Sequence, residues 1–245
     1  MKSTSIQIIE TLRKAGHESY MAGGCVRDML IGVEPKDIDI VTSAKPDEIE
    51  DLLEHTIPIG KEFGVILTVK NGYKFEVATF RSDSGYSDGR RPDAIEFTNA
   101  KEDALRRDFT INALFYDPIE EKIHDFVGGE KDLNERLIRF IGEPEDRIKE
   151  DHLRMLRAVR FKNNFGFQYH PDTYNAIKKH ANLIARISKE RIRDELNKMM
   201  MGANAEQGFE ELFELGLLDH IAPEIVKMKG VGQPSIYHHE GDVWD

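Results

Sequence analysis

Hydrophobic side chains near the start of the chain recur at helical intervals. Ile6, Ile8, Ile9 and Leu12 precede Gly16 with a spacing close to that of one helix face. Glycine often follows the last residue of a helix because it tolerates the left-handed backbone found there. The pattern therefore predicts an opening helix that ends at Gly16.

The next segments alternate between strand and helix signals. A short strand is predicted to end at residues 21–22, where the glycine pair 23–24 interrupts it. Residues 25–30 have the spacing of a helix that stops near Gly32. Over residues 37–41, apolar side chains alternate with aspartate, which is the period of two typical of a strand.

A hairpin is predicted after a further helix. Residues 46–53 have helical spacing with proline in the first turn. Strands over residues 65–69 and 74–80 flank Asn71-Gly72, whose tolerance of positive φ favours a tight turn. Short strands and helices thus mix through about residue 140, which is the pattern of an α+β fold.

The chain beyond Glu143 shows helical spacing and no strand signal. The helical segments cover residues 150–161, 171–180, 188–201 and 205–215. We therefore expect an all-helical region to follow the α+β region, with the boundary between residues 140 and 145.

The charge of the chain is acidic on average but unevenly distributed. The chain has 34 lysines and arginines against 45 acidic residues, a net charge of −11. Residues 147–200 hold 13 basic and 6 acidic residues, a net charge of +7, which leaves −18 for the remainder. This basic section is explained equally well by solvated helix faces and by contact with a phosphate-rich ligand or strand.

The composition favours a reducing compartment. No apolar run approaches the roughly 20 residues needed to cross a bilayer, and residues 1–5 lack the apolar core of a signal peptide. The single cysteine, Cys25, excludes an internal disulfide and a zinc site built on cysteine pairs. We therefore expect a cytoplasmic protein with no membrane partner, and the sequence identifies no protein partner.

Two features of the first region suggest phosphate and metal chemistry. At Gly23-Gly24 a triphosphate can approach backbone N–H groups at a helix start, because no Cβ blocks it. Asp37 and Asp39 lie two apart on the predicted strand, so both carboxylates leave one face and can share a Mg²⁺ ion. Glu76 on the hairpin is a candidate third ligand. Taken singly, these features are more often ordinary turn geometry and exposed strand carboxylates.

The order of these features resembles a known family. Residues 22–28 with Asp37-Ile38-Asp39 resemble the nucleotidyltransferase core of class II tRNA nucleotidyltransferases (CCA-adding) and bacterial poly(A) polymerases. Four further stretches match in order: residues 81–92 resemble the family's mobile loop, 106–114 its ribose-recognition motif, 150–161 its base-selecting helix and 187–192 the start of a neck helix.

The resemblance implies a fold and a domain organisation. The fold would be a mixed-sheet, polymerase-beta-like nucleotidyltransferase head followed by an all-helical neck and body. The head would span residues 1–142 and the helical region 143–225, with 226–245 as the start of a C-terminal extension. Residues 238–245 resemble the opening of an HD-type phosphohydrolase segment, and we expect that extension to be truncated here.

The resemblance also implies roles for individual residues. Asp37 and Asp39 would be catalytic and would hold Mg²⁺. The nucleotide-binding residues would be Gly23, Gly24, Arg27, Arg107, Asp108, Asn112, Asp151, Arg154 and Arg157. The mobile loop would contribute Asp88, Arg90 and Arg91, and the RNA would contact Lys189, Arg191 and Arg193.

Two of these motifs have a physical explanation. A carboxylate at Asp108, beside Arg107, can accept hydrogen bonds from both ribose hydroxyls and so favour ribonucleotides. On a helix starting at Glu150, Asp151 and Arg154 share one face. Asp151 can accept from the exocyclic amine of cytosine or adenine while Arg154 donates to the ring nitrogen, whereas uracil and guanine present a carbonyl to the carboxylate. The alternative for this pair is a salt-bridged surface.

The combined pattern predicts template-independent addition of CMP, AMP or both, from CTP and ATP, to the 3′ end of tRNA. A poly(A) polymerase is the alternative within the same enzyme class. Family members confined to CC addition resemble this region with the loop shortened. The loop Asp88-Gly89-Arg90-Arg91 is intact here, which argues against an enzyme that adds only CC. The alternative of another class is a catalytically silent RNA-binding module, against which the intact aspartates argue.

Overall fold

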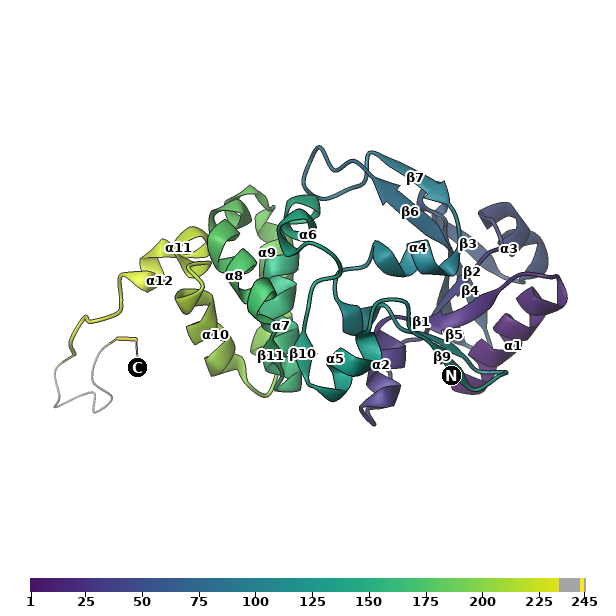
Figure 1. Cartoon of the computed structure of the whole chain (residues 1–245), viewed down its shortest axis with the longest axis horizontal. Coiled ribbons are helices and arrows are strands. Elements are labelled where there is room, and N and C mark those ends of the chain that lie inside the picture. Colours follow the sequence, from purple (N-terminus) through teal and green to yellow (C-terminus); the bar gives the residue numbers. More distant parts are fainter. Residues whose placement is uncertain (234–242, 245) are drawn as a thin grey trace. The chain divides into compact units, whose positions relative to one another are not determined.

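The computed structural model describes residues 1–233 and 243–244, and the chain divides into two compact units, Met1–Glu143 and Pro144–Asp245 (Figure 1). Of the expected C-terminal extension, residues 234–242 and 245 lie outside the described residues. Within the described ranges, no helix has both the length and the apolar character needed to cross a membrane.

The first unit contains strands and helices in alternation. Its strands are β1 (Ser19–Ala22), β2 (Asp39–Thr42), β3 (Thr56–Gly60), β4 (Val65–Lys70), β5 (Tyr73–Thr79), β6 (Arg81–Ser84), β7 (Ala94–Phe97), β8 (Phe115–Asp117), β9 (Lys122–His124) and β10 (Leu137–Ile138). Its helices are α1 (Lys2–Lys14), α2 (Gly24–Leu30), α3 (Pro46–Leu52), α4 (Ala100–Leu105) and α5 (Gly129–Asn134), with short 3₁₀ turns at Lys61–Phe63 and Thr110–Asn112.

A seven-stranded mixed sheet in the described part of the chain organises this unit, with the strand order β3-β4-β5-β2-β1-β8-β9. Strands β2 and β5 run parallel, and the other neighbours run antiparallel. The β4–β5 hairpin turns at Asn71 and Gly72, with φ values of 53° and 77°, as expected from the sequence. Strands β6 and β7 form a separate hairpin.

The strand register explains how the sheet is buried. Met21 pairs with Ile40, Ile40 with Val77 and Val77 with Ile66, and all four side chains are fully buried. Partners in register point to the same face, so these residues form one apolar row across β1, β2, β5 and β4. Helices α1 and α3 pack against these strands.

The opposite face is closed by aromatic residues and by α4. Tyr20, Val41 and Phe115 form one buried cluster with Ala104 of α4. Because Asp39 pairs with Ala22 on this face, the register places Asp39 at the border of the cluster. Strand β2 begins at Asp39, so the expectation that Asp37 also lies on the strand is wrong. The reason is that the β1–β2 ladder ends at the Ala22–Asp39 pair, because β1 is followed by Gly23, with φ of 76°, and the start of α2.

Within the residues that the structure describes, the second unit is helical apart from the two-residue strand β11 (Gln168–Tyr169). Its helices in the described residues are α6 (Pro144–Glu150), α7 (Arg154–Phe165), α8 (Pro171–His180), α9 (Lys189–Met200), α10 (Ala205–Glu214), α11 (Leu218–Ile221) and α12 (Pro223–Val226), with a 3₁₀ segment at Ala181–Arg186. Helix α7 packs on α9 and α10, and α6 packs on α8. The α+β fold followed by a helical region is thus confirmed.

The predicted continuous helix over residues 150–161 is wrong in one respect. The chain leaves the helical path between α6 and α7, because Asp151 binds the backbone locally. Its carboxylate accepts a hydrogen bond from the Leu153 N–H at 3.1 Å, and its carbonyl accepts one from the Arg154 N–H at 3.0 Å. Aspartate commonly competes with the helix ladder in this way.

The buried row provides a test of the sheet register. Ile40→Ala should lower the free energy of unfolding by about 2–5 kcal/mol because it leaves a cavity between the sheet and its helices. Ile57→Ala is the matched control, since Ile57 lies on the edge strand β3 and is 49% exposed. That change should cost under about 0.5 kcal/mol in the same urea titration. Equal losses for the two variants would contradict the register described above.

Candidate active site

Two carboxylates of the first unit meet at the parallel pair of strands. The register Ile40–Val77 places Asp39 of β2 beside Glu76 of β5. The pKa of Asp39 is raised to about 6. The largest cause is burial, which removes part of the hydration of the carboxylate, and the negative charges of Glu76 and Asp37 come next. The positive charge of Arg107 opposes this shift. Both Asp37 and Asp39 keep solvent-accessible surface, so an ion can reach them.

The described residues contain no group of three His, Cys, Asp or Glu side chains placed to hold a metal ion. The negative charge of Glu76 raises the pKa of Asp39, and the place of Glu76 as a third ligand stays a prediction. Asp37 and Asp39 remain a pair of oxygen donors. Such a pair suits a hard divalent cation that keeps water or phosphate oxygens in its other positions.

The glycine turn lies beside the carboxylates and beside two arginines. Gly23 follows Ala22, the partner of Asp39, and has φ of 76°, a conformation that favours glycine. A Cβ added at Gly23 would lie 3.0 Å from Nη1 of Arg107, and one added at Gly24 would lie 3.4 Å from Nη2 of Arg27. The structure thus brings this turn together with both guanidinium groups.

A chain of hydrogen bonds links α2 to the segment over residues 106–114. Arg27, which is 6% exposed, donates from Nη1 to Oδ1 of Asn112 and from Nη2 to Asp28 at 2.7 Å. Asn112 in turn donates from Nδ2 to Oδ1 of Asp108 at 3.1 Å. The same Asp108 oxygen accepts the Phe109 N–H at 2.8 Å. These contacts fix the orientation of the Asp108 carboxylate at the proposed ribose position.

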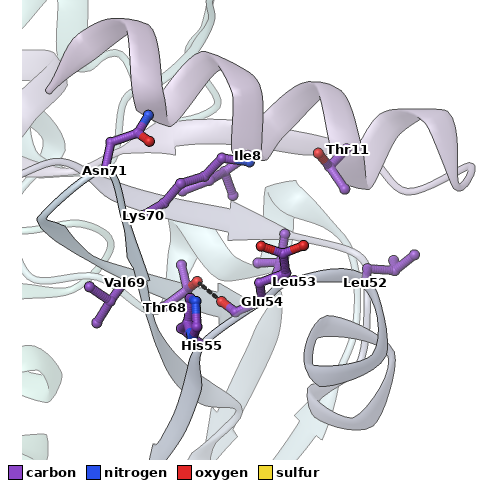
Figure 2. Close-up of a pocket in the computed structure, with 10 residues that line it drawn as sticks. All are labelled: Ile8, Thr11, Leu52, Leu53, Glu54, His55, Thr68, Val69, Lys70 and Asn71. Atoms are coloured by element: carbon purple, nitrogen blue, oxygen red, sulfur yellow. Dashed lines mark hydrogen bonds between the residues drawn. The ribbon is translucent and has the colours of Figure 1, made fainter.

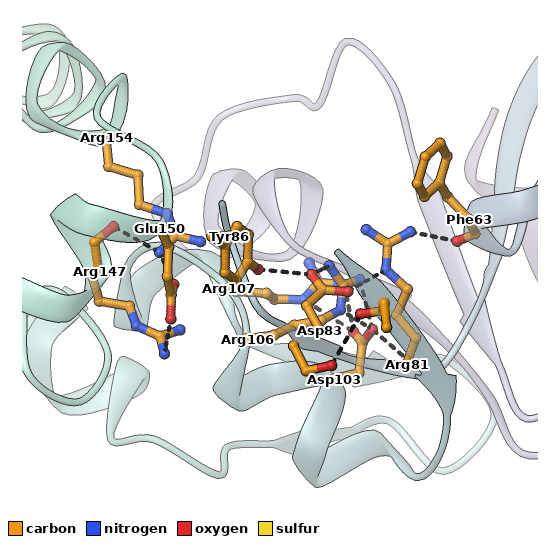
Figure 3. A network of polar contacts seen from close by, with 12 residues as sticks. Phe63, Arg81, Asp83, Tyr86, Asp103, Arg106, Arg107, Arg147, Glu150 and Arg154 are labelled. Atoms are coloured by element: carbon orange, nitrogen blue, oxygen red, sulfur yellow. Dashed lines mark hydrogen bonds and ion pairs between the residues drawn. The ribbon is translucent and has the colours of Figure 1, made fainter. Parts of the chain in front are cut away.

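Asp103 is a buried residue that the sequence interpretation did not identify (Figure 3). It lies on α4, is fully buried, and forms ion pairs with Arg106 at 2.7 Å and Arg107 at 3.0 Å. Burial would raise the pKa of Asp103, but Arg107 and Arg106 outweigh it and hold that pKa below its ordinary value. The spacing Asp103-x-x-Arg106-Arg107 is the available sequence signal, since residues three and four apart meet on a helix.

The loop between β6 and β7 holds Asp88, Arg90 and Arg91. The Asp88 carboxylate accepts the backbone N–H groups of Arg90 at 2.8 Å and Arg91 at 2.7 Å. These hydrogen bonds, that of Arg91 foremost, lower the pKa of Asp88. The Arg90 and Arg91 side chains are exposed. The acid therefore shapes the turn, while the two arginines face solvent.

Asp151 and Arg154, in the second unit, contact different partners. Asp151 ends the α6 region and forms an ion pair with Arg191 of α9 at 2.9 Å. Arg154, 8% exposed, pairs with Glu150 and donates to the Arg147 carbonyl at 3.0 Å (Figure 3). Because the helix breaks between them, the two side chains do not share one helix face as the sequence predicted.

The other basic residues of the second unit are divided between solvent and internal contacts. Lys189 and Arg193 are exposed on α9, and the Arg193 guanidinium pairs with its neighbour Asp194 at 3.1 Å. Arg191 is half-buried against Asp151. Arg157 lies over the Phe161 ring at 5.3 Å on α7.

A recess of about 390 Å³ lies elsewhere in the first unit (Figure 2). Its wall includes Ile8 and Thr11 of α1, His55, and Thr68 of β4, whose hydroxyl donates to the Glu54 carbonyl at 3.0 Å. None of the site residues expected from the sequence lines it. The recess is therefore separate from the candidate site.

Comparison with known proteins identifies two family models on this chain. The model described as the poly A polymerase head domain matches residues 19–139. The model described as a probable RNA and SrmB-binding site of polymerase A matches residues 166–228. The first range contains the glycine turn, Asp37, Asp39 and the Asp108–Asn112 segment.

Curated relatives and solved structures agree with these models. The chain is 44% identical over 214 residues to a CCA-adding enzyme of Ligilactobacillus salivarius, covering 87% of this chain and 53% of the relative. It is 40% identical over 218 residues to the CCA-adding enzyme of Bacillus subtilis, covering 89% and 55%. A crystal structure of the Bacillus stearothermophilus CCA-adding enzyme in complex with CTP superposes with a TM-score of 0.81 at 39% identity, covering 88% of this chain and 52% of that one.

The chain spans about half the length of the curated relatives that it matches. The match to a nucleotidyltransferase family implies use of a divalent metal ion. Both matched models, the relatives and the shared fold correspond to the family suggested by the sequence motifs. The chain therefore belongs to the family of class II tRNA nucleotidyltransferases and bacterial poly(A) polymerases.

Proposed function

We propose that the chain carries the nucleotide-adding part of an RNA nucleotidyltransferase that adds CMP, AMP or both to the 3′ end of tRNA. The observation that carries this proposal is the convergence in the first unit of the Gly23 turn, the Asp39 carboxylate and the Arg107 guanidinium. A triphosphate needs all three: a close backbone approach, metal ligands and positive charge. A solved complex of the Thermotoga maritima CCA-adding enzyme with tRNA, 26% identical to this chain, supports tRNA as the acceptor.

Asp37 and Asp39 would hold a Mg²⁺ ion. The structure supports this fit, because burial and then the negative charges of Glu76 and Asp37 make ionisation of Asp39 unfavourable, and a cation at the pair would offset that repulsion. The ion would supply charge neutralisation at the α-phosphate and a lower pKa for the RNA 3′ hydroxyl. Its oxygen ligands are of the type that Mg²⁺ prefers.

The chain's own residues would bind and orient the nucleotide. Gly23 and Gly24 let the phosphates approach the backbone, and Arg107 stands beside that approach. Arg27 is held by Asp28 and Asn112, so its charge is fixed next to the same turn. Asp108, oriented by Asn112, would accept a hydrogen bond from the ribose.

Choice of base is assigned to Asp151 and Arg154. Both are half-buried or buried and already carry charged partners, so base recognition would exchange those partners for the Watson–Crick edge. Lys189 and Arg193 are exposed and would contact the RNA backbone. Because tRNA and nucleoside triphosphates are available in the cytoplasm, the proposal includes a cytoplasmic location.

A poly(A) polymerase is the second candidate, favoured by the description of the head-domain model. The two candidates differ in their acceptor and in the length of the product. A tRNA nucleotidyltransferase stops after completing the CCA end, whereas a poly(A) polymerase extends many RNA 3′ ends with AMP alone.

Incubation of the 245-residue chain with tRNA that ends before CCA, before the terminal A, or complete, with labelled CTP or ATP, tests the proposal. Asp39→Ala should abolish incorporation while RNA affinity stays within about threefold, because the carboxylates serve the chemical step and exposed basic residues serve binding. Asp47→Ala is the matched control, since the Asp47 side chain is 85% exposed on α3. Incorporation by Asp39→Ala within about tenfold of wild type would refute the carboxylate assignment.

The raised pKa of Asp39 predicts a pH dependence of metal binding. The cation needs the ionised carboxylate, so protons compete below the pKa of about 6. Affinity for Mn²⁺, followed by electron paramagnetic resonance, should be constant above that pH and fall as the pH drops through it. Glu76→Gln removes a negative charge that raises the pKa and should move the midpoint to lower pH. A wild-type midpoint near 4, unchanged in Glu76→Gln, would contradict this electrostatic account.

Base selection is tested by replacing Asp151 and Arg154 together with alanine. If both read the base, discrimination against UTP and GTP should collapse together with efficient use of CTP or ATP, measured in competition on one tRNA primer. The control replaces Asp146 and Lys149 of α6, an ion pair whose side chains are 65% and 57% exposed. That pair should leave selectivity unchanged and cost under about 1 kcal/mol of stability. Unchanged selectivity in a folded Asp151/Arg154 double variant would remove the base-reading role.

A further inference from the structure

We propose that Asp103 is a positioning residue that aims the Arg107 guanidinium at the glycine turn of the candidate active site. The inference rests on the proposed function, in which that turn receives the nucleotide triphosphate. It assigns a role to a residue that does not itself reach the turn and that acts through Arg107.

One oxygen of the Asp103 carboxylate, Oδ1, is held by two hydrogen bonds. Oδ1 accepts from Nε of Arg106 at 2.9 Å and from the Arg81 N–H at 3.3 Å. Arg106 is itself paired with Asp83 of β6 at 3.4 Å (Figure 3). Because Asp103 is fully buried, water cannot replace these contacts. One oxygen of the acid is thus anchored to the β6 strand and to Arg106.

The other oxygen determines how Arg107 is oriented. Oδ2 accepts from both Nε at 3.2 Å and Nη2 at 3.0 Å of Arg107. A guanidinium is planar, so fixing two of its nitrogens fixes the direction of the third. That third nitrogen, Nη1, lies 3.4 Å from the Asn112 carbonyl and 3.0 Å from the position of a Cβ added at Gly23. The pairing with Asp103 therefore directs Nη1 toward the turn.

The remaining contacts of Arg107 that the structure records are weaker. The Asn112 hydrogen bond is long, and the Phe115 ring lies 5.0 Å from the guanidinium carbon, a contact that does not fix rotation in the ring plane. Without the carboxylate of Asp103, Arg107 would keep its charge but lose its defined direction. Nucleotide affinity should then fall even though no residue at the turn has changed.

The test measures CTP binding to the full chain by calorimetry in the presence of Mg²⁺. Asp103→Asn keeps the shape of the side chain but removes the charge that binds both arginines, and it should weaken CTP binding about tenfold. Asp117→Asn is the matched control. Asp117 is also a buried acid of this unit, 1% exposed, and it pairs with Arg13 outside the candidate site. Asp117→Asn should lower the melting temperature comparably and leave CTP affinity within about twofold.

A double-mutant cycle separates positioning from a general structural effect. In an Arg107→Ala background, Asp103→Asn should change CTP affinity by less than about twofold, because its effect passes through Arg107. Arg107→Lys keeps the charge and leaves Asp103 intact, and it should lose affinity about as strongly as Asp103→Asn. It provides the same test if Asp103→Asn does not fold, and full affinity in Arg107→Lys would overturn the inference.

The outcomes distinguish the inference from the proposed function. A wild-type chain that binds no CTP would overturn the proposed function and the inference with it. A wild-type chain that binds CTP, together with an Asp103→Asn variant that binds as well as Asp117→Asn, would overturn the inference alone. Additive effects of Asp103→Asn and Arg107→Ala would overturn it as well, since they would show that the acid acts independently of the arginine.

Discussion

The pairing of β1 with β2 is the constraint on which the candidate site depends. The last pair of this ladder joins Ala22 to Asp39, and Gly23 directly follows the end of β1. A hydrogen-bonded ladder fixes neighbouring strands about 5 Å apart. The carboxylate and the glycine turn are therefore held together by backbone geometry, and the buried apolar row beneath them, including Met21 and Ile40, resists a shift in register.

Arg107 lies near two carboxylates, Asp103 and Asp39, whose pKa values are shifted in opposite directions. Asp103 is buried between two arginines, and their positive charge lowers its pKa despite the loss of hydration. Burial and then the negative charges of Glu76 and Asp37 raise the pKa of Asp39 to about 6, because the positive charge of Arg107 does not outweigh them. Asp103 thus stays ionised as a fixed partner for arginine, whereas Asp39 is a carboxylate whose ionisation a bound cation would favour.

In the second unit, two ion pairs determine which neighbours Asp151 and Arg154 face. Asp151 both interrupts the helical path before α7 and pairs with Arg191 of α9. Arg154 begins α7 and pairs back to Glu150 at the end of α6. A break at this point lets two residues that are close in sequence face different neighbours. The proposed base-reading role therefore requires both ion pairs to be exchanged when a nucleotide binds, which costs part of the binding energy.

The sequence by itself determined the features that follow local rules. Asn71-Gly72 specifies its turn through positive φ, and proline at the start of α8 marks that helix where it was expected. The order of the motifs was also enough to suggest the family. Only the tertiary structure decided that Asp39 meets Glu76, that Asp151 meets Arg191, 40 residues away, and that Asp103 orients Arg107. These contacts depend on strand register, a helix break and side-chain direction, which arise when distant segments pack and leave no local periodicity to read.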